Sequence, residues 1–298
     1  MSISLSTNLH HSHPHAHLTV STPSMSILRR LTLPIHHHHR HQRRRFLSHI
    51  AAAVRQDTTV WTPTPISLIE SAAESLFHVS IDVSDAPEIA SSHTRAGQYL
   101  QLKVPDSPKP SFLAIASPPS LAAARGELQF LVKTVAGSTA ELLCGLKKGD
   151  VVELTPAMGN GFNVDLISPP ETFPTILIFA TGSGISPIRS LIESGFCADK
   201  RSDVRLYYGA RNLRRMAYQD RFKDWESSGV KIFPVLSKPD EEWSGETGYV
   251  QAAFSRSKNI VSPNSTGAVL CGHKQMAEEI TSILTEDGVS IDKILKNF

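Results

Sequence analysis

Short segments that alternate hydrophobic and polar residues fill the chain between Ser67 and about Asp165. A period of two is typical of strands that bury one face, and Pro, Gly and Asp separate the segments as turn residues. Several such strands in succession predict an antiparallel barrel or sandwich. The segments lie at 77–83, 99–103, 112–116, 128–132 and 151–155.

The pattern changes after Pro169 and Pro170. Strands and helices that alternate along a chain indicate a parallel sheet with right-handed crossovers. We therefore expect two folded domains, an antiparallel β-barrel at 57–168 and a doubly wound parallel α/β sheet at 169–298. The apolar runs that predict the parallel strands lie at 175–180, 204–208, 230–236 and 267–271, with helical spacing between them.

A glycine-rich break, Gly182-x-Gly184-x-x-Pro187, follows the first of these runs. A strand that turns through glycines into a helix N-terminus is how a parallel sheet receives a nucleotide pyrophosphate. Ser186 is the expected N-cap, and Pro187 the expected first helical residue. Proline replaces the third glycine of the dinucleotide fingerprint. The motif alone therefore fits a nucleotide-binding turn and a strand-turn-helix connection without a ligand about equally well. The candidate nucleotide-binding residues here are Thr181, Gly182, Ser183, Gly184, Ile185 and Pro187.

Residues 1–56 contain no Asp or Glu, seven arginines and eleven of the fourteen histidines. Removing those seven charges from the net +2 leaves −5 on residues 57–298. An acid-free start rich in Arg and Ser is typical of an organelle transit peptide. We expect import into the chloroplast stroma, with the mitochondrion as second choice and cleavage near Ala51 to Gln56. No stretch approaches the roughly 18 apolar residues of a membrane span.

Two further features of the composition argue against metal and nucleic-acid binding. The histidine run at 36–39 has no carboxylate or cysteine nearby, so a low-complexity leader explains it better than a metal site. The arginines at 43–45 are more simply explained by import than by nucleic-acid binding, because the rest of the chain is acidic.

Cys144, Cys197 and Cys271 show neither a disulfide framework nor a zinc or iron–sulfur spacing, which favours a reducing compartment.

The order of the segments resembles the ferredoxin–NADP⁺ reductase superfamily over nearly all of residues 65–298. Among its subgroups, the chain is most similar to plant plastid oxidoreductases related to a kiwifruit fruit protein. The resemblance implies a flavin-binding barrel, an NAD(P)-binding α/β domain, FAD or FMN as cofactor, and NADPH or NADH as substrate. The motifs that carry it are Gly97-Gln98-Tyr99, Ile115-Ala116-Ser117, Gly137-Ser138-Thr139, Gly159-Asn160-Gly161-Phe162, Thr181 to Pro187, Tyr208-Gly209-Ala210-Arg211, Gly248-Tyr249-Val250 and Cys271-Gly272-x-x-x-Met276.

The flavin side departs from the superfamily pattern. An Arg-x-Tyr-Ser stretch that handles the flavin is replaced by Ser111, Leu113 and Ala114. A charge-assisted contact to phosphate is worth about 1.5–3 kcal/mol, so its loss weakens binding roughly tenfold to a hundredfold. Residues 137–139 resemble the flavin-phosphate segment and equally fit a capped helix start. The flavin-binding candidates are Leu113, Ala114, Ile115, Ala116, Ser117, Val132, Lys133, Gly137, Ser138 and Thr139.

Cys271 ends the last predicted apolar run, at the sheet edge where open α/β sheets bind ligands. In similar reductases this cysteine lies against nicotinamide C4, which makes Cys271 a catalytic candidate; the alternative is a small buried hydrophobic residue. Phe298 is the second catalytic candidate, because relatives place a terminal aromatic near the flavin, with a core plug as the alternative. Arg211 is a candidate for a 2′-phosphate or a solvated basic turn. Gly272 and Met276 complete the candidate set.

These residues predict an enzyme that passes hydride from NAD(P)H to a bound flavin and on to an unidentified acceptor, a small molecule or a small redox protein. A ferredoxin partner is not predicted. Docking such an acidic protein would need a basic surface, and residues 57–298, with a net charge of −5, show no global one. The alternative is a redox-inactive nucleotide-binding or sensing protein that kept the fold. An iron–sulfur electron-transfer subunit is disfavoured, because no cysteine cluster follows Cys271. The oligomeric state is not predicted.

Overall fold

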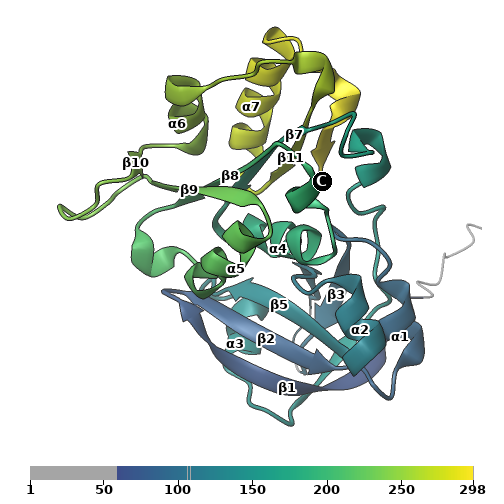
Figure 1. Cartoon of the computed structure of the whole chain (residues 1–298). Helices are drawn as coiled ribbons and strands as arrows, with labels where there is room; N and C mark the ends of the chain where they lie inside the picture. The colour runs from purple at the N-terminus through teal and green to yellow at the C-terminus, as the bar shows by residue number, and fades with distance from the viewer. Residues whose placement is uncertain (1–58, 106, 108, 298) are drawn as a thin grey trace, which may run out of the picture. The chain divides into compact units, whose positions relative to one another are not determined.

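The computed structural model describes residues 59–105, 107 and 109–297 (Figure 1). All of them belong to the second of two compact units, which begins at Gln56. The expected transit peptide, its cleavage region and Phe298 lie outside the described residues. No helix among the described residues is long and apolar enough to cross a membrane.

The first half of the unit is a six-stranded antiparallel sheet with the strand order β4-β3-β6-β1-β2-β5. The long strand β1 pairs with β6 through its first residues and with β2 through the rest. A bridge between Ile115 and Phe130 brings the two edge strands together, so the sheet curls into a barrel around one apolar core. Its strands are β1 (Thr62–Ala73), β2 (Leu76–Asp82), β3 (Tyr99–Lys103), β4 (Ser111–Ala114), β5 (Glu127–Lys133) and β6 (Val151–Leu154).

Three short helices complete the barrel, α1 (Pro87–Ser92), α2 (Pro119–Arg125) and α3 (Thr139–Cys144). The helices α1 and α2 begin with proline, whose missing N–H is harmless at a helix start. Ser138 caps α3 by accepting a 3.4 Å hydrogen bond from Glu141 N. The predicted capped start of this helix is therefore present.

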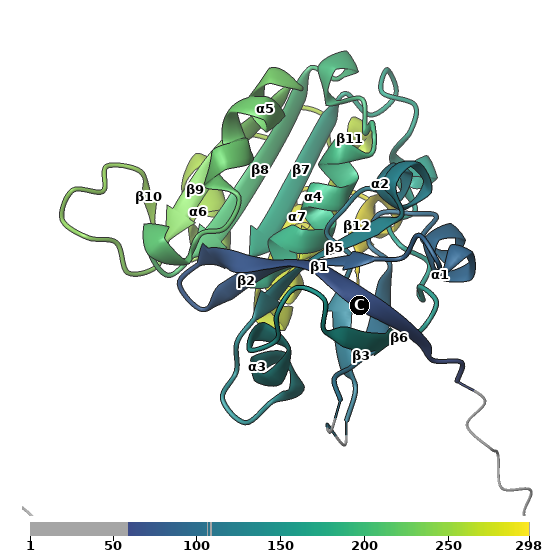
Figure 2. The same cartoon turned by 90° about the horizontal axis from the view of Figure 1, so that it is seen from below.

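The second half is a six-stranded sheet in which every pair is parallel, with the order β10-β9-β8-β7-β11-β12 (Figures 1 and 2). Together with the barrel before it, this sheet confirms the predicted fold class. The two outer strands have two and three residues, too few to show a period in the sequence. The strands are β7 (Thr175–Thr181), β8 (Asp203–Ala210), β9 (Val230–Leu236), β10 (Glu246–Thr247), β11 (Thr266–Cys271) and β12 (Ile294–Lys296).

Helices cover both faces of this sheet, because the strand residues are apolar on both sides. Ile176 and Ile178 of β7 belong to the cluster that contains the buried residues of α4 (Ile185–Glu193) and α5 (Phe222–Ser227). Leu177 and Phe179 belong to the cluster of α6 (Val250–Ser257) and α7 (Lys274–Glu286). Short 3-10 turns connect the elements: η1 (Val164–Ile167), η2 (Gly182–Gly184), η3 (Ala198–Lys200), η4 (Leu213–Arg215), η5 (Gln219–Arg221), η6 (Pro263–Ser265) and η7 (Ile291–Lys293).

The helix after the glycine turn begins earlier than the sequence predicts. The turn η2 leads directly into α4 at Ile185, so Pro187 is the third helical residue and Ser186 is not the N-cap. Gly184 has helical backbone angles (φ −63°, ψ −11°), which lets the helical path start directly after the strand. Proline is tolerated there because the first turn of a helix has no intrahelical acceptor for its N–H groups.

The strand β7 is separated from the barrel strand β6 by residues 155–174, and the predicted domain boundary at 168/169 lies in that segment and stays a prediction. Polar contacts join the two sheets. Ser190 of α4 donates a 2.7 Å hydrogen bond to Ser117 O, and Arg189 Nη2 donates to Gln129 Oε1 at 2.6 Å. The rings of His78 and Tyr218 stack at a centroid distance of 5.0 Å. These contacts hold the barrel against the parallel sheet.

Candidate functional site

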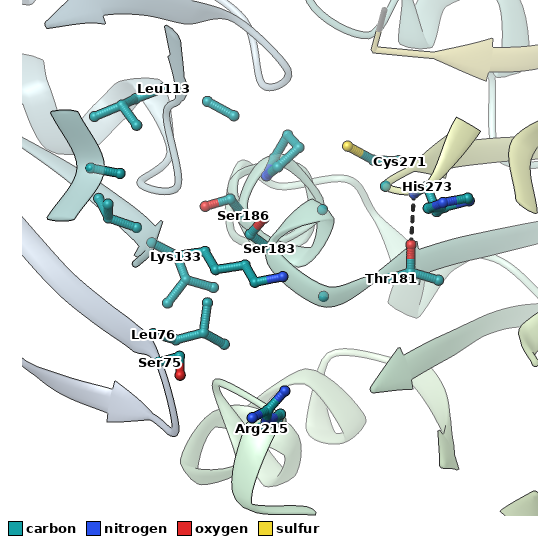
Figure 3. Close-up of a pocket in the computed structure, with 18 of the residues that line it drawn as sticks. Ser75, Leu76, Leu113, Lys133, Thr181, Ser183, Ser186, Arg215, Cys271 and His273 are labelled. Atoms are coloured by element: carbon teal, nitrogen blue, oxygen red, sulfur yellow. Dashed lines mark hydrogen bonds between the residues drawn. The ribbon is translucent and has the colours of Figure 1, made fainter. Parts of the chain in front are cut away.

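A cavity of about 990 Å³ lies where the two sheets meet. The barrel contributes β4, the end of β5 and the turn between β1 and β2, while the parallel sheet contributes the loops after β7, β8 and β11 (Figure 3). Ligands of open α/β sheets bind outside the carboxyl ends of the strands, and these three loops follow such ends. The cavity is therefore the candidate functional site.

Its floor is formed by close contact between the loops after β7 and β11. A Cβ atom at Gly184 would lie 2.6 Å from Cys271 O and 2.6 Å from Gly272 Cα, so only glycine fits there. Gly272 has φ +132°, a backbone conformation that side chains disfavour. The backbone N–H of His273 donates a 2.8 Å hydrogen bond to Thr181 Oγ1 (Figure 3). Both loops are thus held in one arrangement.

Gly182 has a different role from Gly184. Its φ is +54°, and a Cβ atom placed there would meet nothing within 4 Å, so the residue borders open space. Gly182 also lines the cavity, at the N-terminal side of α4. An anion placed there would meet backbone N–H groups and the positive end of the helix dipole.

Ser186 supplies a buried hydroxyl without a partner. The residue is 2% exposed, its Oγ has no hydrogen-bond partner among the described residues, and it lines the cavity. Figure 3 shows this oxygen directed toward the barrel side, where Leu113 and Leu76 lie. Buried hydroxyls are nearly always hydrogen-bonded, so this one is a candidate partner for a polar group of a ligand.

Cys271 lies at the cavity wall with 8% of its surface exposed. Burial raises the pKa of its thiol to about 11, while Asn297 and the backbone of Gly272 act weakly in the opposite direction. The group is therefore a neutral thiol at physiological pH. It can contact a ligand as a soft apolar surface, but it is not a thiolate nucleophile.

The barrel wall is largely apolar. Leu113, Ala114 and Val132 line it, and Phe112 at its border is 64% exposed. Lys133 is the exception: its side chain extends into the cavity (Figure 3), and its Nζ has no ion pair or hydrogen bond with the described residues. This wall suits a flat apolar ring with an anionic group near Lys133.

A basic turn follows β8 at the opposite side of the cavity. Arg211 and Arg215 both line it. Arg215 Nε donates a 2.8 Å hydrogen bond to Glu74 Oε1, which comes from the turn between β1 and β2. The hydrogen bond from Arg215 is the main cause that lowers the pKa of Glu74. This turn therefore directs Arg215, which is hydrogen-bonded to Glu74, and Arg211, which interacts with Glu74 through its charge alone, toward the cavity.

The structure brings most predicted site residues together but leaves others outside the cavity wall. Those that line the cavity are Leu113, Ala114, Val132, Lys133, Thr181, Gly182, Ser183, Gly184, Pro187, Arg211, Cys271 and Gly272. Those that do not are Ile115, Ala116, Ser117, Gly137, Ser138, Thr139, Ile185 and Met276. The roles proposed for both groups stay predictions, and Phe298 lies outside the described residues.

Each residue outside the wall has another structural role. Ile115, Ala116 and Ile185 are fully buried, and Met276 is a buried residue of α7 that packs in the core between this helix, α6 and the sheet. Ser117 Oγ accepts a 3.1 Å hydrogen bond from Gln129 N at the contact between the sheets.

Several donors of residues 137–139 have acceptors within the barrel. Gly137 N donates to Glu141 Oε2 at 2.7 Å, and Thr139 Oγ1 donates to Lys109 O at 2.7 Å. The carboxylate of Glu141 therefore accepts the hydrogen bond of Gly137 N, a backbone N–H in the segment that resembles the flavin-phosphate segment. The capped helix start is therefore present, and the flavin-phosphate role of this segment stays a prediction.

The cavity also contains residues for which the sequence offers no signal. Glu74, Ser75 and Leu76 come from the turn between β1 and β2, and Asn297 follows β12. None belongs to a recognisable motif, and only the tertiary fold brings them to the site. His273, by contrast, is the N-cap residue of α7.

The fold and the site define the class of this protein: the chain belongs to the ferredoxin–NADP⁺ reductase superfamily. Residues 178–282 match the family model described as "Oxidoreductase NAD-binding domain". The chain is 52% identical over 249 residues to "Fruit protein pKIWI502" of Actinidia deliciosa, an alignment that covers 82% of this chain and 78% of that protein.

More distant relatives show the same class. The "Anthranilate 1,2-dioxygenase electron transfer component" of Acinetobacter baylyi is 22% identical over 82% of this chain and 69% of its own length. The crystal structure of a ferredoxin NADP⁺ reductase from Neisseria gonorrhoeae with bound FAD and NADP superposes with a TM-score of 0.64 and 20% identity. That alignment covers 80% of this chain and 99% of the other, and it establishes the shared fold.

Proposed function

We propose that the chain is a flavin-dependent NAD(P)H oxidoreductase. The observation that carries this proposal is that the apolar barrel wall and the glycine turn at a helix N-terminus line the same cavity. The Neisseria structure of the same fold contains FAD and NADP. Two planar cofactors that exchange electrons have to share one site, and positioning them supplies most of the catalysis.

The residues present fit a flavin. Leu113 and Ala114 would cover the isoalloxazine ring, and Lys133 would pair with an anionic part of the cofactor, FAD or FMN. The unpaired hydroxyl of Ser186 would hydrogen-bond the polar edge of the ring. When bound, the flavin supplies acceptance of hydride from NAD(P)H and delivery of electrons to an acceptor.

The other residues would hold the pyridine nucleotide. The backbone around Gly182 and the start of α4 would receive its pyrophosphate. The neutral thiol of Cys271 would provide an uncharged surface beside the nicotinamide, and the tied loops after β7 and β11 would keep that surface in place. Cys271, which is 8% exposed, would exclude water from its side of the contact between the rings.

The acceptor is proposed as a small molecule or a small redox protein. One relative is named as the electron transfer component of a dioxygenase, which supports a protein acceptor. We further propose that residues 1–56 direct the chain to the chloroplast, on the strength of their acid-free, arginine-rich composition. A fluorescent protein fused behind residues 1–56 would accumulate in chloroplasts; accumulation in mitochondria would favour the second choice.

The first test is flavin uptake by the purified full chain. We expect a yellow protein, or a colourless one that takes up added FAD or FMN with quenching of the flavin fluorescence. Protein that remains colourless with both flavins would contradict the proposal.

A second candidate function is nucleotide sensing without redox turnover. Ser111, Leu113 and Ala114 on the cavity wall favour it, because none offers a charge or an aromatic face to a flavin. Such a protein would bind nucleotide and leave any bound flavin oxidised. Reduction by NAD(P)H in the absence of oxygen therefore separates the two candidates.

A further inference from the structure

A second cavity, of about 390 Å³, lies away from the candidate functional site and shares no lining residue with it. Ala96 and the start of α2 line it from the barrel, Leu191 of α4 and residues 194–197 line it from the parallel sheet, and Phe162 lines it from the segment that joins the two. Small-molecule sites typically have volumes of about 300–1,000 Å³, so this cavity is large enough for a small ligand.

A buried arginine without a counter-ion lines this cavity. Arg201 is 9% exposed and forms no ion pair within the part of the chain that the structure describes. Its Nη1 donates a 2.5 Å hydrogen bond to Phe173 O, and its Cζ lies 4.8 Å from the centroid of the Phe196 ring. Neither partner carries a formal charge. Buried charged groups are normally paired, so Arg201 is a candidate partner for an anion.

The free edge of Arg201 has the geometry that binds a carboxylate. Its Nε is buried without a hydrogen-bond partner among the described residues, and Nη2 donates to none of them either. Nε and Nη2 form a planar edge that can give two parallel hydrogen bonds to one carboxylate. In this chain Arg205 presents the same two nitrogens to the carboxylate of Asp203. A ligand carboxylate would fit Arg201 in the same way.

The other walls of the cavity favour an anion with an apolar body. Phe162 and Leu191 are buried apolar residues at the wall. Arg95 adds a second positive charge, and its 3.9 Å ion pair with Asp165 is weak because the two side chains are 52% and 80% exposed. The charge of Glu171 also acts on Arg201, but Glu171 is exposed and does not line the cavity.

We propose that this cavity is a second ligand site, which binds a small organic carboxylate with its anionic group on Nε and Nη2 of Arg201 and its apolar body against Phe162 and Leu191. The proposal goes beyond the flavin and nucleotide site, because the two cavities have no wall residue in common. Cys197 lines the same cavity with a partly exposed thiol, so a ligand bound there would cover it. The thiol therefore serves as a reporter of occupancy.

The first test compares benzoate, a planar carboxylate with an apolar ring, with benzamide, its uncharged analogue. Modification of Cys197 by iodoacetamide in the full chain is followed by peptide mass spectrometry with each compound present. Benzoate at about five times its dissociation constant should slow the modification roughly sixfold, because only the unoccupied protein reacts. Benzamide should have little effect, and Cys144, which does not line the cavity, should react at the same rate throughout.

The second test measures the dissociation constant of benzoate by calorimetry. Arg201→Gln removes the charge and the planar edge, and it should weaken binding roughly tenfold to a hundredfold. Arg201→Lys keeps the charge without the planar edge, and it should also bind benzoate more weakly than the wild type. Arg125→Gln is the matched control, because Arg125 is exposed at the end of α2 and does not line the cavity; it should leave the constant unchanged. Melting temperatures show whether each variant folds.

The outcomes decide the proposal without reference to flavin uptake. Absence of protection by benzoate, or equal protection by benzoate and benzamide, would overturn it even where a variant fails to fold. Unchanged benzoate affinity in a folded Arg201→Gln would also overturn it. Sulfate at the same ionic strength should protect Cys197 less than benzoate does; equal protection would show that the cavity selects charge alone and would contradict an organic carboxylate as its ligand.

Discussion

The backbone N–H of His273 donates a 2.8 Å hydrogen bond to Thr181 Oγ1. This contact joins the ends of β7 and β11, two neighbouring parallel strands whose loops form the floor of the cavity. It places the glycine turn and the thiol of Cys271 against each other. The site therefore depends on a packing arrangement that leaves no room for larger residues.

Gly184→Ala tests that packing. The new Cβ would lie 2.6 Å from Cys271 O and from Gly272 Cα, and both neighbours are backbone, so the loops would have to shift. We expect the free energy of unfolding to fall by about 1–3 kcal/mol and nucleotide affinity to fall with it. Urea denaturation measures the first, and calorimetry with 5′-AMP the second.

Gly145→Ala is the matched control for this change. Gly145 has φ −87°, and the closest contact of an added Cβ is 3.4 Å from Leu142 O, an ordinary distance. Its effect on unfolding should stay within about 0.5 kcal/mol. Equal effects of the two substitutions would contradict the account of the cavity floor.

Ser186→Ala separates a ligand-binding hydroxyl from a structural one. The hydroxyl has no partner among the described residues, so its removal should leave the stability of the flavin-free protein unchanged or slightly raised. Flavin affinity should fall by roughly tenfold if the hydroxyl bonds the cofactor. Unfolding curves and fluorescence titration with flavin give the two readouts.

Ser190→Ala, on the same helix, is the control with the opposite expectation. Its hydroxyl donates a 2.7 Å hydrogen bond to Ser117 O, and its loss should destabilise the protein by about 1 kcal/mol. If Ser186→Ala destabilised the flavin-free protein and left flavin affinity unchanged, Ser186 would be structural.

Cys271 should be slow to react with iodoacetamide at neutral pH. Burial raises its pKa to about 11, and the thiolate is the reactive form. We expect its modification to accelerate as the pH rises toward 11, well after the more exposed Cys197 has reacted. Peptide mass spectrometry after timed alkylation measures both sites. Rapid modification of Cys271 at pH 7 would contradict its assignment as a neutral contact surface.

His93 should make the fold sensitive to acid. The residue is 3% exposed, its ring nitrogens have no side-chain hydrogen-bond partner among the described residues, and burial lowers its pKa to about 4. Between pH 6.5 and 4 the unfolded chain binds a proton that the folded chain does not, so this residue's contribution to stability is lost as the pH falls below 6.5.

The measurement is the free energy of unfolding at pH 7.5 and pH 5 for the wild type and for His93→Leu. The wild type should lose up to about 1.4 kcal/mol per pH unit more than the variant over this range. Parallel pH dependence in the two proteins would show that His93 is not the titrating group.

Several residues of the cavity wall could be predicted from the sequence because the signals that select them are local. Gly182 and Gly184 follow one apolar run, Cys271 ends another and Gly272 follows it, and the ends of parallel strands meet at one edge of a sheet. The start of α4 was mispredicted, since helix signals within the sequence do not reveal that Gly184 takes helical angles. Boundaries of this kind depend on the backbone path.

Two parts of the site depend on the tertiary fold. Glu74 meets Arg215 across 141 positions of sequence, and no pattern links a hairpin turn to a loop in another sheet. Residues 137–139 resemble a phosphate segment, and in the structure Glu141 accepts the hydrogen bond of Gly137 N, while the role of the segment in flavin binding stays a prediction. A motif indicates which donors exist, and only the structure shows whether they are free.

The central claim is that one cavity brings a pyridine nucleotide to a flavin. Its most direct test is anaerobic titration of the flavin-loaded full chain with NADPH and with NADH, followed by absorbance near 450 nm, about where oxidised flavins absorb. The account predicts that the flavin band bleaches as one equivalent of either nucleotide is added, and that an added electron acceptor restores it. A flavin band that persists while both nucleotides bind would contradict the account and favour a nucleotide-binding protein without redox turnover.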